Sequence, residues 1–155
     1  MEISRKNILI KSTSDNINKF KRLGFEFYQK NNMIHLFSFR HFLILILLNM
    51  KEKFLQSNIN LLSPNEDFIK FYKRKGTNIN KENSESQIKE KINFYLEIKY
   101  YNFFYVIMHN YYLQYEKDSS NFSSFVFFNK IIDFISKEEL KMIDFDNESI
   151  HEKLE

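Results

Sequence analysis

Few residues in this chain have the type and spacing that catalysis or metal binding requires. Its four histidines show no metal-ligand spacing with one another, and no His-Glu-x-x-His pattern occurs. Cysteine is absent, and the two glycines, Gly24 and Gly76, are too far apart to form a phosphate-cradling loop. The adjacent carboxylates Glu138 and Glu139 belong to a predicted helix start, where they complement the helix dipole. We therefore expect no enzyme activity, no cofactor, no metal site and no small-molecule substrate.

The basic cluster Lys73-Arg74-Lys75 has the clearest chemistry. It directly precedes an almost wholly polar stretch, residues 76–91. Basic side chains bind phosphates with release of counterions, so we predict that this cluster contacts a nucleic acid and that 76–91 is an extended polar loop. The first 110 residues hold 18 basic and 10 acidic residues, whereas the remainder holds 5 and 10. The net charge of +3 is modest, however, and a protein partner stays open.

Composition indicates the genetic source of the chain. Phe, Tyr, Ile, Asn and Lys make up 83 of the 155 residues, alanine is missing, and Gly, Pro and Arg together number 7. The abundant residues have AU-rich codons and the rare ones GC-rich codons, so the gene is extremely AT-rich. Such genes are typical of protist organelles, reduced bacteria and some phages. The length predicts a single domain with a sizeable core.

Local patterns predict an α+β chain. Strands are expected where β-forming residues cluster, and helices where apolar residues recur at helical spacing behind a capping residue. The predicted elements are a strand at 6–11, a helical turn at 16–23 capped within 12–15 and ended by Gly24, a strand at 33–39, a helix at about 40–57, a strand-like run at 67–73, a strand or hairpin at 92–108, and one or two closing helices near 131–143 with a capping box at 136–139.

The predicted helix at 40–57 is apolar on all sides in its first turns, and such a helix is normally covered. Phe42 lies on one face, while Ile44, Ile46 and Leu47 fill the others. We predict that Phe42, Ile44, Ile46 and Leu47 form an interface with a neighbouring protein. The aromatic stretch 92–108 is interpreted as core filling, with base stacking as the alternative.

No segment predicts a transmembrane helix. The apolar run 42–48 is far shorter than the roughly 20 residues that cross a bilayer, and Glu97 and Lys99 interrupt the second candidate. The first 25 residues lack the apolar core of a secretory signal. We expect no membrane span, and a protein made inside an organelle needs no targeting signal.

Three short motifs follow one another within residues 34–88. Residues 38–44 read Ser-Phe-Arg-His-Phe-Leu-Ile, residues 62–64 read Leu-Ser-Pro, and residues 78–87 read Asn-Ile-Asn-Lys-Glu-Asn-Ser-Glu-Ser-Gln. In this order and separation they resemble the universal small-subunit ribosomal protein ten family, whose rRNA-contacting loop reads His-Val-Asn-Lys-Lys-Ser-Arg-Glu-Gln-Phe. The Ser-Pro-His before that loop and the arginine within it have no counterpart here. The resemblance covers about a third of the chain.

The resemblance implies a ferredoxin-like βαββαβ core whose long loop contacts rRNA in the head of the small ribosomal subunit. It adds Arg40, His41, Asn80 and Lys81 to the predicted RNA-binding residues, beside Lys73, Arg74 and Lys75. The implied organisation is an N-terminal extension at 1–32, a single α+β domain at 33–143 that includes the loop 76–91, and an acidic, helical tail at 144–155.

Together these features predict a structural constituent of the small subunit of an organellar ribosome. We expect it in the mitochondrion, bound to rRNA and to neighbouring ribosomal proteins. Two other classes stay open. A non-catalytic accessory subunit of an organellar respiratory complex would use aromatic surfaces as interface anchors. A small phage or bacterial inhibitor protein would be motif-free and would bind a host factor.

Overall fold

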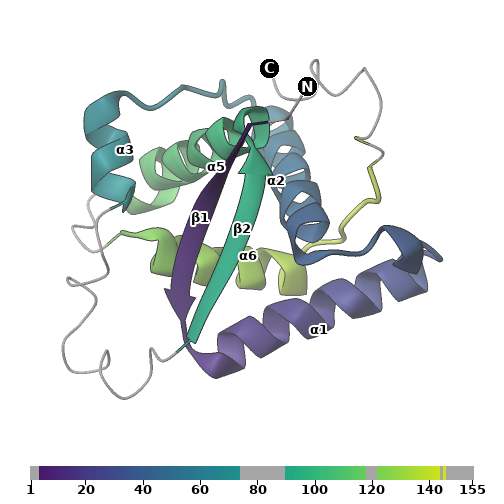
Figure 1. The fold of residues 1–155 in the computed structure, drawn as a ribbon. Coiled ribbons are helices and arrows are strands. Elements are labelled where there is room, and N and C mark those ends of the chain that lie inside the picture. Colours follow the sequence, from purple (N-terminus) through teal and green to yellow (C-terminus); the bar gives the residue numbers. More distant parts are fainter. Residues whose placement is uncertain (1–3, 74–89, 118–121, 144, 146–155) are drawn as a thin grey trace.

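The computed structural model of the chain describes residues 4–73, 90–117, 122–143 and 145. A two-stranded antiparallel ribbon lies across a layer of helices (Figure 1). This arrangement confirms the predicted α+β class. The elements are β1 (Arg5–Ser12), α1 (Ser14–Lys30), a 3₁₀ turn (Ile34–Leu36), α2 (Phe39–Gln56), α3 (Glu66–Lys73), β2 (Glu90–Glu97), α5 (Ile98–Tyr111), a π-helical turn (Tyr112–Glu116) and α6 (Ser124–Lys137).

The ribbon pairs two segments that lie far apart in the sequence. Arg5 of β1 is opposite Glu97 of β2, and Ser12 is opposite Glu90. Alternate residues of both strands are buried against the helices, because successive side chains of a strand point to opposite faces. The strand predicted at 6–11 is thus confirmed. The last two residues of the predicted loop 76–91, Glu90 and Lys91, belong to β2. Residues 76–89 lie outside the described residues.

The described part of the predicted N-terminal extension (1–32), residues 4–32, packs into the core of the domain. Ile8 and Ile10 of β1 and Phe20 and Tyr28 of α1 are all buried in the common core. One of the two strands and a long helix therefore come from this region. The described residues on both sides of the predicted boundary at residue 33 contribute side chains to the same core. Of the predicted tail, 144–155, only residue 145 is described.

Gly24 lies inside α1 and does not end it, contrary to the prediction. The cap predicted within 12–15 is confirmed, since the Thr13 hydroxyl accepts the Asn16 N–H. The helix continues past Gly24 because Tyr28 still belongs to its buried face. A Cβ at position 24 would lie 2.6 Å from Cδ2 of Phe42. The glycine is needed here for the close approach of α1 and α2.

Two segments predicted as strands form turns or helices. Residues 33–39 make the 3₁₀ turn and the start of α2, where the Ser38 hydroxyl accepts the His41 N–H at 3.0 Å. Residues 67–73 belong to α3, and Asn65 caps that helix by accepting the Phe68 N–H at 2.9 Å. In both places a capping side chain before the apolar run starts a helix and overrides the β-propensity of the residues. The helix predicted at about 40–57 is confirmed by α2.

The aromatic stretch 92–108 is divided between a strand and a helix. Alternating burial ends at Glu97, and α5 begins at Ile98. Beyond that point Phe103, Phe104 and Ile107 are all buried, and a helix between α2 and the ribbon can bury neighbouring positions in this way. The prediction of one long strand or hairpin is correct only up to Glu97. The prediction that these rings fill the core is confirmed.

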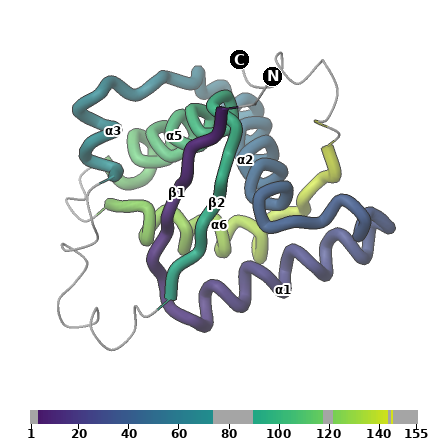
Figure 2. The backbone as a smooth tube through the Cα atoms, in the orientation of Figure 1, coloured from purple at the N-terminus to yellow at the C-terminus, as the bar shows by residue number. Residues whose placement is uncertain are grey.

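A closing helix is confirmed, but the capping box at 136–139 marks its end instead of a start. α6 stops at Lys137, and Glu138 forms an ion pair with Lys53 of α2. The following residues have no regular structure and run along α2 (Figure 2). The Asn49 side chain holds them there, since its amide donates to the Lys141 carbonyl and its oxygen accepts the Lys141 N–H.

Helix α2 is covered by the chain itself. Residues 42–51 are all buried, and Phe42, Ile44, Ile46 and Leu47 are at most 3 % exposed. The ribbon, α1, α5 and the segment after α6 pack around it. The predicted protein interface at these four residues is therefore wrong, because other segments of the chain already cover their side chains.

A polar pair is buried between α3 and α5. The Tyr72 hydroxyl lies 2.7 Å from Nδ1 of His109, and the Phe68 ring packs 4.6 Å from the imidazole, centroid to centroid. Burial lowers the pKa of His109 from its ordinary 6.5 and raises the pKa of Tyr72. The lowered pKa favours the neutral imidazole of His109, which shares this hydrogen bond with the protonated Tyr72 hydroxyl.

Gly24→Ala is expected to destabilise the protein by about 1–3 kcal/mol, because the new methyl group overlaps the Phe42 ring. In an exposed helix the same change stabilises by about 1 kcal/mol, so the sign is diagnostic. Urea unfolding measures it, with the exposed Lys19→Ala of the same helix as the control. A Gly24→Ala variant as stable as the wild type would contradict the close packing of α1 on α2.

Stability is expected to fall as the pH drops below about 6.5. Because the folded-state pKa of His109 is lowered, its contribution is complete above the unfolded-state pKa and declines below it, where only the unfolded chain takes up the proton. Urea unfolding between about pH 8 and about pH 5 should show a smaller loss for His109→Gln than for the wild type. The exposed His35→Gln is the matched control. An equal loss in all three proteins would disprove the assignment.

Candidate nucleic-acid interface

The structure describes three of the seven residues predicted to bind RNA. Arg40 is exposed in the first turn of α2, with Nη1 3.5 Å from the Tyr95 carbonyl oxygen of β2. Lys73 is exposed at the end of α3, and His41 is half-buried. The other four, Arg74, Lys75, Asn80 and Lys81, lie outside the described residues.

His41 faces the core. Its Nδ1 is hydrogen-bonded to the Tyr28 hydroxyl, and its ring lies 4.2 Å from the ring of Phe145. These contacts hold the imidazole between α1 and the segment after α6. His41 thus helps to fix the start of α2 in place, and its contact with RNA stays a prediction.

The outer face of the ribbon is a polar surface, and it points toward the viewer in Figure 1, with the helices behind it. It consists of alternate residues on the two strands, and all but Glu97 are exposed. Its members are Arg5, Asn7, Leu9 and Lys11 of β1 and Lys91, Asn93, Tyr95 and Glu97 of β2.

The two lysines of this face repel each other. Lys11 and Lys91 are directly opposite in the register, and like charges in that position destabilise a ribbon. Within the described residues neither makes an ion pair. A bound anion between the two ammonium groups would remove the repulsion, and a phosphate is such an anion. This end of the ribbon is therefore suited to a phosphate group.

An aromatic ring and two amides lie beyond the lysines. Tyr95 is 59 % exposed, which is far more than a structural tyrosine needs. Asn7 lies opposite it, and the Asn7 amide donates to Oδ1 of Asn93 at 2.9 Å. Unpaired bases stack on exposed aromatic rings, and amide groups hydrogen-bond base edges. The outer face thus combines phosphate-binding and base-binding groups within one strand length.

Lys6 and Lys73 form a separate basic group beside α5, on the helix side of the ribbon. Nζ of Lys73 lies 5.2 Å from the ring centroid of Tyr101 and 5.7 Å from that of Tyr105, while Nζ of Lys6 lies 5.3 Å from Tyr101. Burial and the neighbouring Tyr101 raise the pKa of Tyr105, so its ring stays neutral. Cation–π contacts orient an ammonium group without neutralising it. The cation–π contacts of Lys6 and Lys73 are therefore compatible with binding a polyanion.

The residues predicted from the sequence to bind RNA did not include Arg5, Lys11, Lys91 or Tyr95. A signal was present, because polar and apolar residues alternate in both strands and mark one exposed face on each. The strand register that brings these residues together could not be predicted from the sequence, since it connects residues as far apart in the chain as Asn7 and Asn93. Only that pairing turns two scattered sets of basic residues into one surface.

Two other kinds of feature are absent from the described residues. Across the described ranges, no three or more His, Asp or Glu side chains lie together in a way that could hold a metal ion. In that part of the chain, no helix combines the length and the apolar character needed to cross a bilayer. No family model matches the chain, and no curated protein or solved structure is a match to it. The interface is therefore argued from its own geometry.

Lys91→Glu is expected to act in opposite directions on stability and on RNA binding. It replaces a like-charged pair by an opposite-charged one, which should stabilise the fold by about 0.2–1 kcal/mol in urea unfolding. It also removes a phosphate contact, so binding to a single-stranded RNA should weaken, and the slope of log affinity against log salt should become shallower by about 0.7 or more.

The charge-neutral Asn93→Gln on the same strand serves as the control and should leave the salt slope unchanged. Equal RNA affinity and salt slope for wild type and Lys91→Glu would rule out phosphate binding at this end of the ribbon.

Proposed function

We propose that the protein is a non-catalytic RNA-binding constituent of the small subunit of an organellar (mitochondrial) ribosome. The observation that carries the proposal is the outer face of the ribbon. On it Lys11 and Lys91 oppose each other with no ion-pair partner among the described residues, and the exposed ring of Tyr95 lies farther along the same face. A single RNA strand suits this face, because phosphates lie against the lysines while a base stacks on the ring.

The ribosomal setting is supported by the AT-rich composition and by the resemblance of residues 34–88. Ser38 of the first motif caps α2, in keeping with a turn that leads into a helix. The implied ferredoxin-like βαββαβ core has four strands, and the described residues form two. The proposal therefore depends on the RNA-binding face and not on that strand arrangement.

Contact with a neighbouring protein is proposed at a surface other than α2. Three apolar side chains, Phe25 of α1 and Ile34 and Leu36 of the 3₁₀ turn, are exposed. The ring centroids of Phe25 and Phe37 lie 6.1 Å apart. Exposed apolar side chains that gather in one place are typical of protein contacts. The same patch would serve an accessory subunit of a respiratory complex, so dependence on RNA is what separates the two functions.

The experiment is gradient sedimentation of a native organellar lysate, with the chain located by mass spectrometry. The proposed function predicts co-migration with the small ribosomal subunit and a shift to light fractions after ribonuclease treatment. Lys91→Glu should sediment with a smaller bound fraction than Asn93→Gln, because only the former loses a phosphate contact.

Two results would contradict the ribosomal function. Migration with a membrane complex that resists ribonuclease would favour the accessory-subunit function and the apolar patch at Phe25. Migration as a free small protein before any treatment would favour an inhibitor of a soluble factor.

A further inference from the structure

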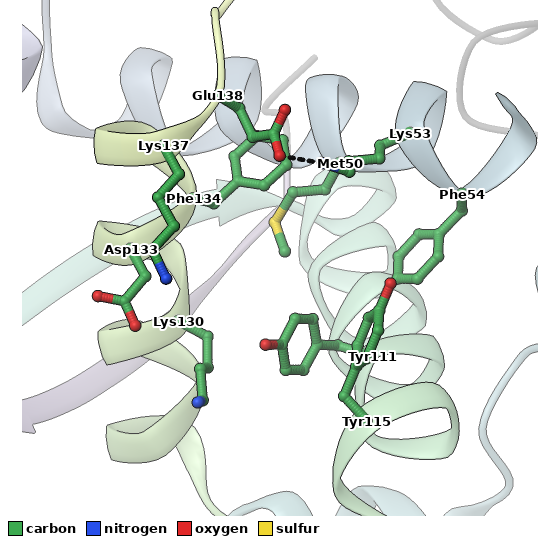
Figure 3. A pocket seen from close by; sticks show the side chains of 10 residues that line it. All are labelled: Met50, Lys53, Phe54, Tyr111, Tyr115, Lys130, Asp133, Phe134, Lys137 and Glu138. Atoms are coloured by element: carbon green, nitrogen blue, oxygen red, sulfur yellow. Dashed lines mark hydrogen bonds and ion pairs between the residues drawn. The ribbon is translucent and has the colours of Figure 1, made fainter. Parts of the chain in front are cut away.

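A cavity of about 220 Å³ opens between α2, α6 and the end of α5 (Figure 3). The sulfur of Met50 points into it from α2, and the rings of Phe54 and Phe134 flank it. The side chains of Tyr111 and Tyr115 form one wall, opposite Lys130 and Asp133 of α6. The remaining lining residues are Lys53, Lys137 and Glu138. The site therefore has an apolar interior and a charged rim.

The tyrosine wall depends on an uncommon backbone. Tyr111 ends α5, and the chain continues as the π-helical turn Tyr112–Glu116. The rings of Tyr111 and Tyr115 lie 4.8 Å apart, yet Tyr115 is 59 % exposed. π-Helical turns are rare and frequently occur at functional sites. Burial, helped by Glu116, Tyr115 and Asp133, raises the pKa of Tyr111 to about 12, so its hydroxyl is neutral.

Some of the charged residues around the rim form ion pairs and others do not. Lys53 pairs with Glu138, and Nζ of Lys130 lies 3.6 Å from the Glu116 carboxylate. Asp133 and Lys137, one turn apart on α6, make no ion pair within the described residues. The cavity thus has a carboxylate, Asp133, and an ammonium group, Lys137, beside an aromatic wall, and neither is in an ion pair with a described residue.

We propose that this cavity binds one nucleoside monophosphate unit. The base stacks against Tyr111 and Tyr115, its exocyclic amino group donates to Asp133, and the phosphate binds Lys137. A cavity of about 150 Å³ accepts a benzene ring, so the larger volume here has room for a base, with the ribose and phosphate at the mouth. The same chemistry is offered by a free nucleotide and by a base turned out of an RNA strand.

This site is formed by elements other than the ribbon and goes beyond the proposed function. It is tested by isothermal titration calorimetry on the full chain carrying Lys91→Glu, so that the outer face of the ribbon contributes little to the measured nucleotide binding. The probes are AMP, adenosine and the trinucleotide ApApA. AMP should bind with saturation. Tyr115→Leu should weaken it by about tenfold, because the stacking ring is lost, and Tyr115→Phe should change it by less than about twofold.

Lys137→Gln separates the phosphate contact from the base contact. It should lower the affinity for AMP to that for adenosine and leave adenosine binding unchanged. Since Tyr115 and Lys137 are exposed, these variants should keep the urea midpoint of the parent chain. Binding of AMP at least as tightly as ApApA assigns the site to a free nucleotide, and tighter binding of ApApA assigns it to RNA.

The proposal is overturned if neither AMP nor ApApA binds with saturation, or if Tyr115→Leu binds both as well as the parent does. It is also overturned if free phenylalanine binds more tightly than AMP, since an aromatic amino acid would then be the ligand. Because the parent chain already lacks the Lys91 contact, loss of ribbon binding and loss of cavity binding are measured separately.

Discussion

Eight residue pairs join β1 to β2, and the chain forms α1, α2 and α3 between them. Closing so long a stretch costs conformational entropy, and a two-stranded ribbon by itself is marginally stable in water. The ribbon persists because its inner face, with Ile10, Phe94 and Leu96, is buried on the helices. The same burial exposes the opposite face of both strands, so the candidate interface is a direct consequence of how the core is closed.

The core uses the residues that the biased composition supplies. Phe20 of α1 lies 5.1 Å from Phe42, 5.8 Å from Phe94 and 5.3 Å from Phe128, centroid to centroid, and so connects three other elements. Tilted and edge-on ring pairs of this kind stabilise beyond the area they bury. Gly24 lets Phe42 approach α1 closely enough to take part. A chain without alanine thus achieves close packing through rings and one well-placed glycine.

Two buried asparagines hold segments without regular structure against the helices. Asn110 accepts the Leu62 N–H at 3.0 Å and donates to the Leu62 carbonyl at 2.9 Å, just as Asn49 does with Lys141. Both amides are buried and satisfied, and each holds a segment without regular structure against a helix. These contacts carry the chain around the helical layer, while the basic outer face and the cavity beside Tyr115 remain on separate surfaces.

The sequence by itself determined the features that local patterns encode: the α+β class, the strand at 6–11, the helix at 40–57, a closing helix, and aromatic rings as core. It also indicated basic residues that could bind a polyanion, although only Arg40 and Lys73 of the predicted set are both described and exposed. The strands expected at 33–39 and 67–73 failed because one capping side chain, Ser38 or Asn65, outweighed several β-forming residues.

Tertiary structure alone decided which apolar surfaces are covered and which basic residues meet. Periodicity shows that a face is apolar, but it does not show whether the cover comes from the same chain, and α2 is enclosed by distant segments of its own chain. In the same way Lys11 and Lys91 become neighbours only through the strand register. Both outcomes depend on contacts between residues far apart in the sequence, and local patterns carry no information about such contacts.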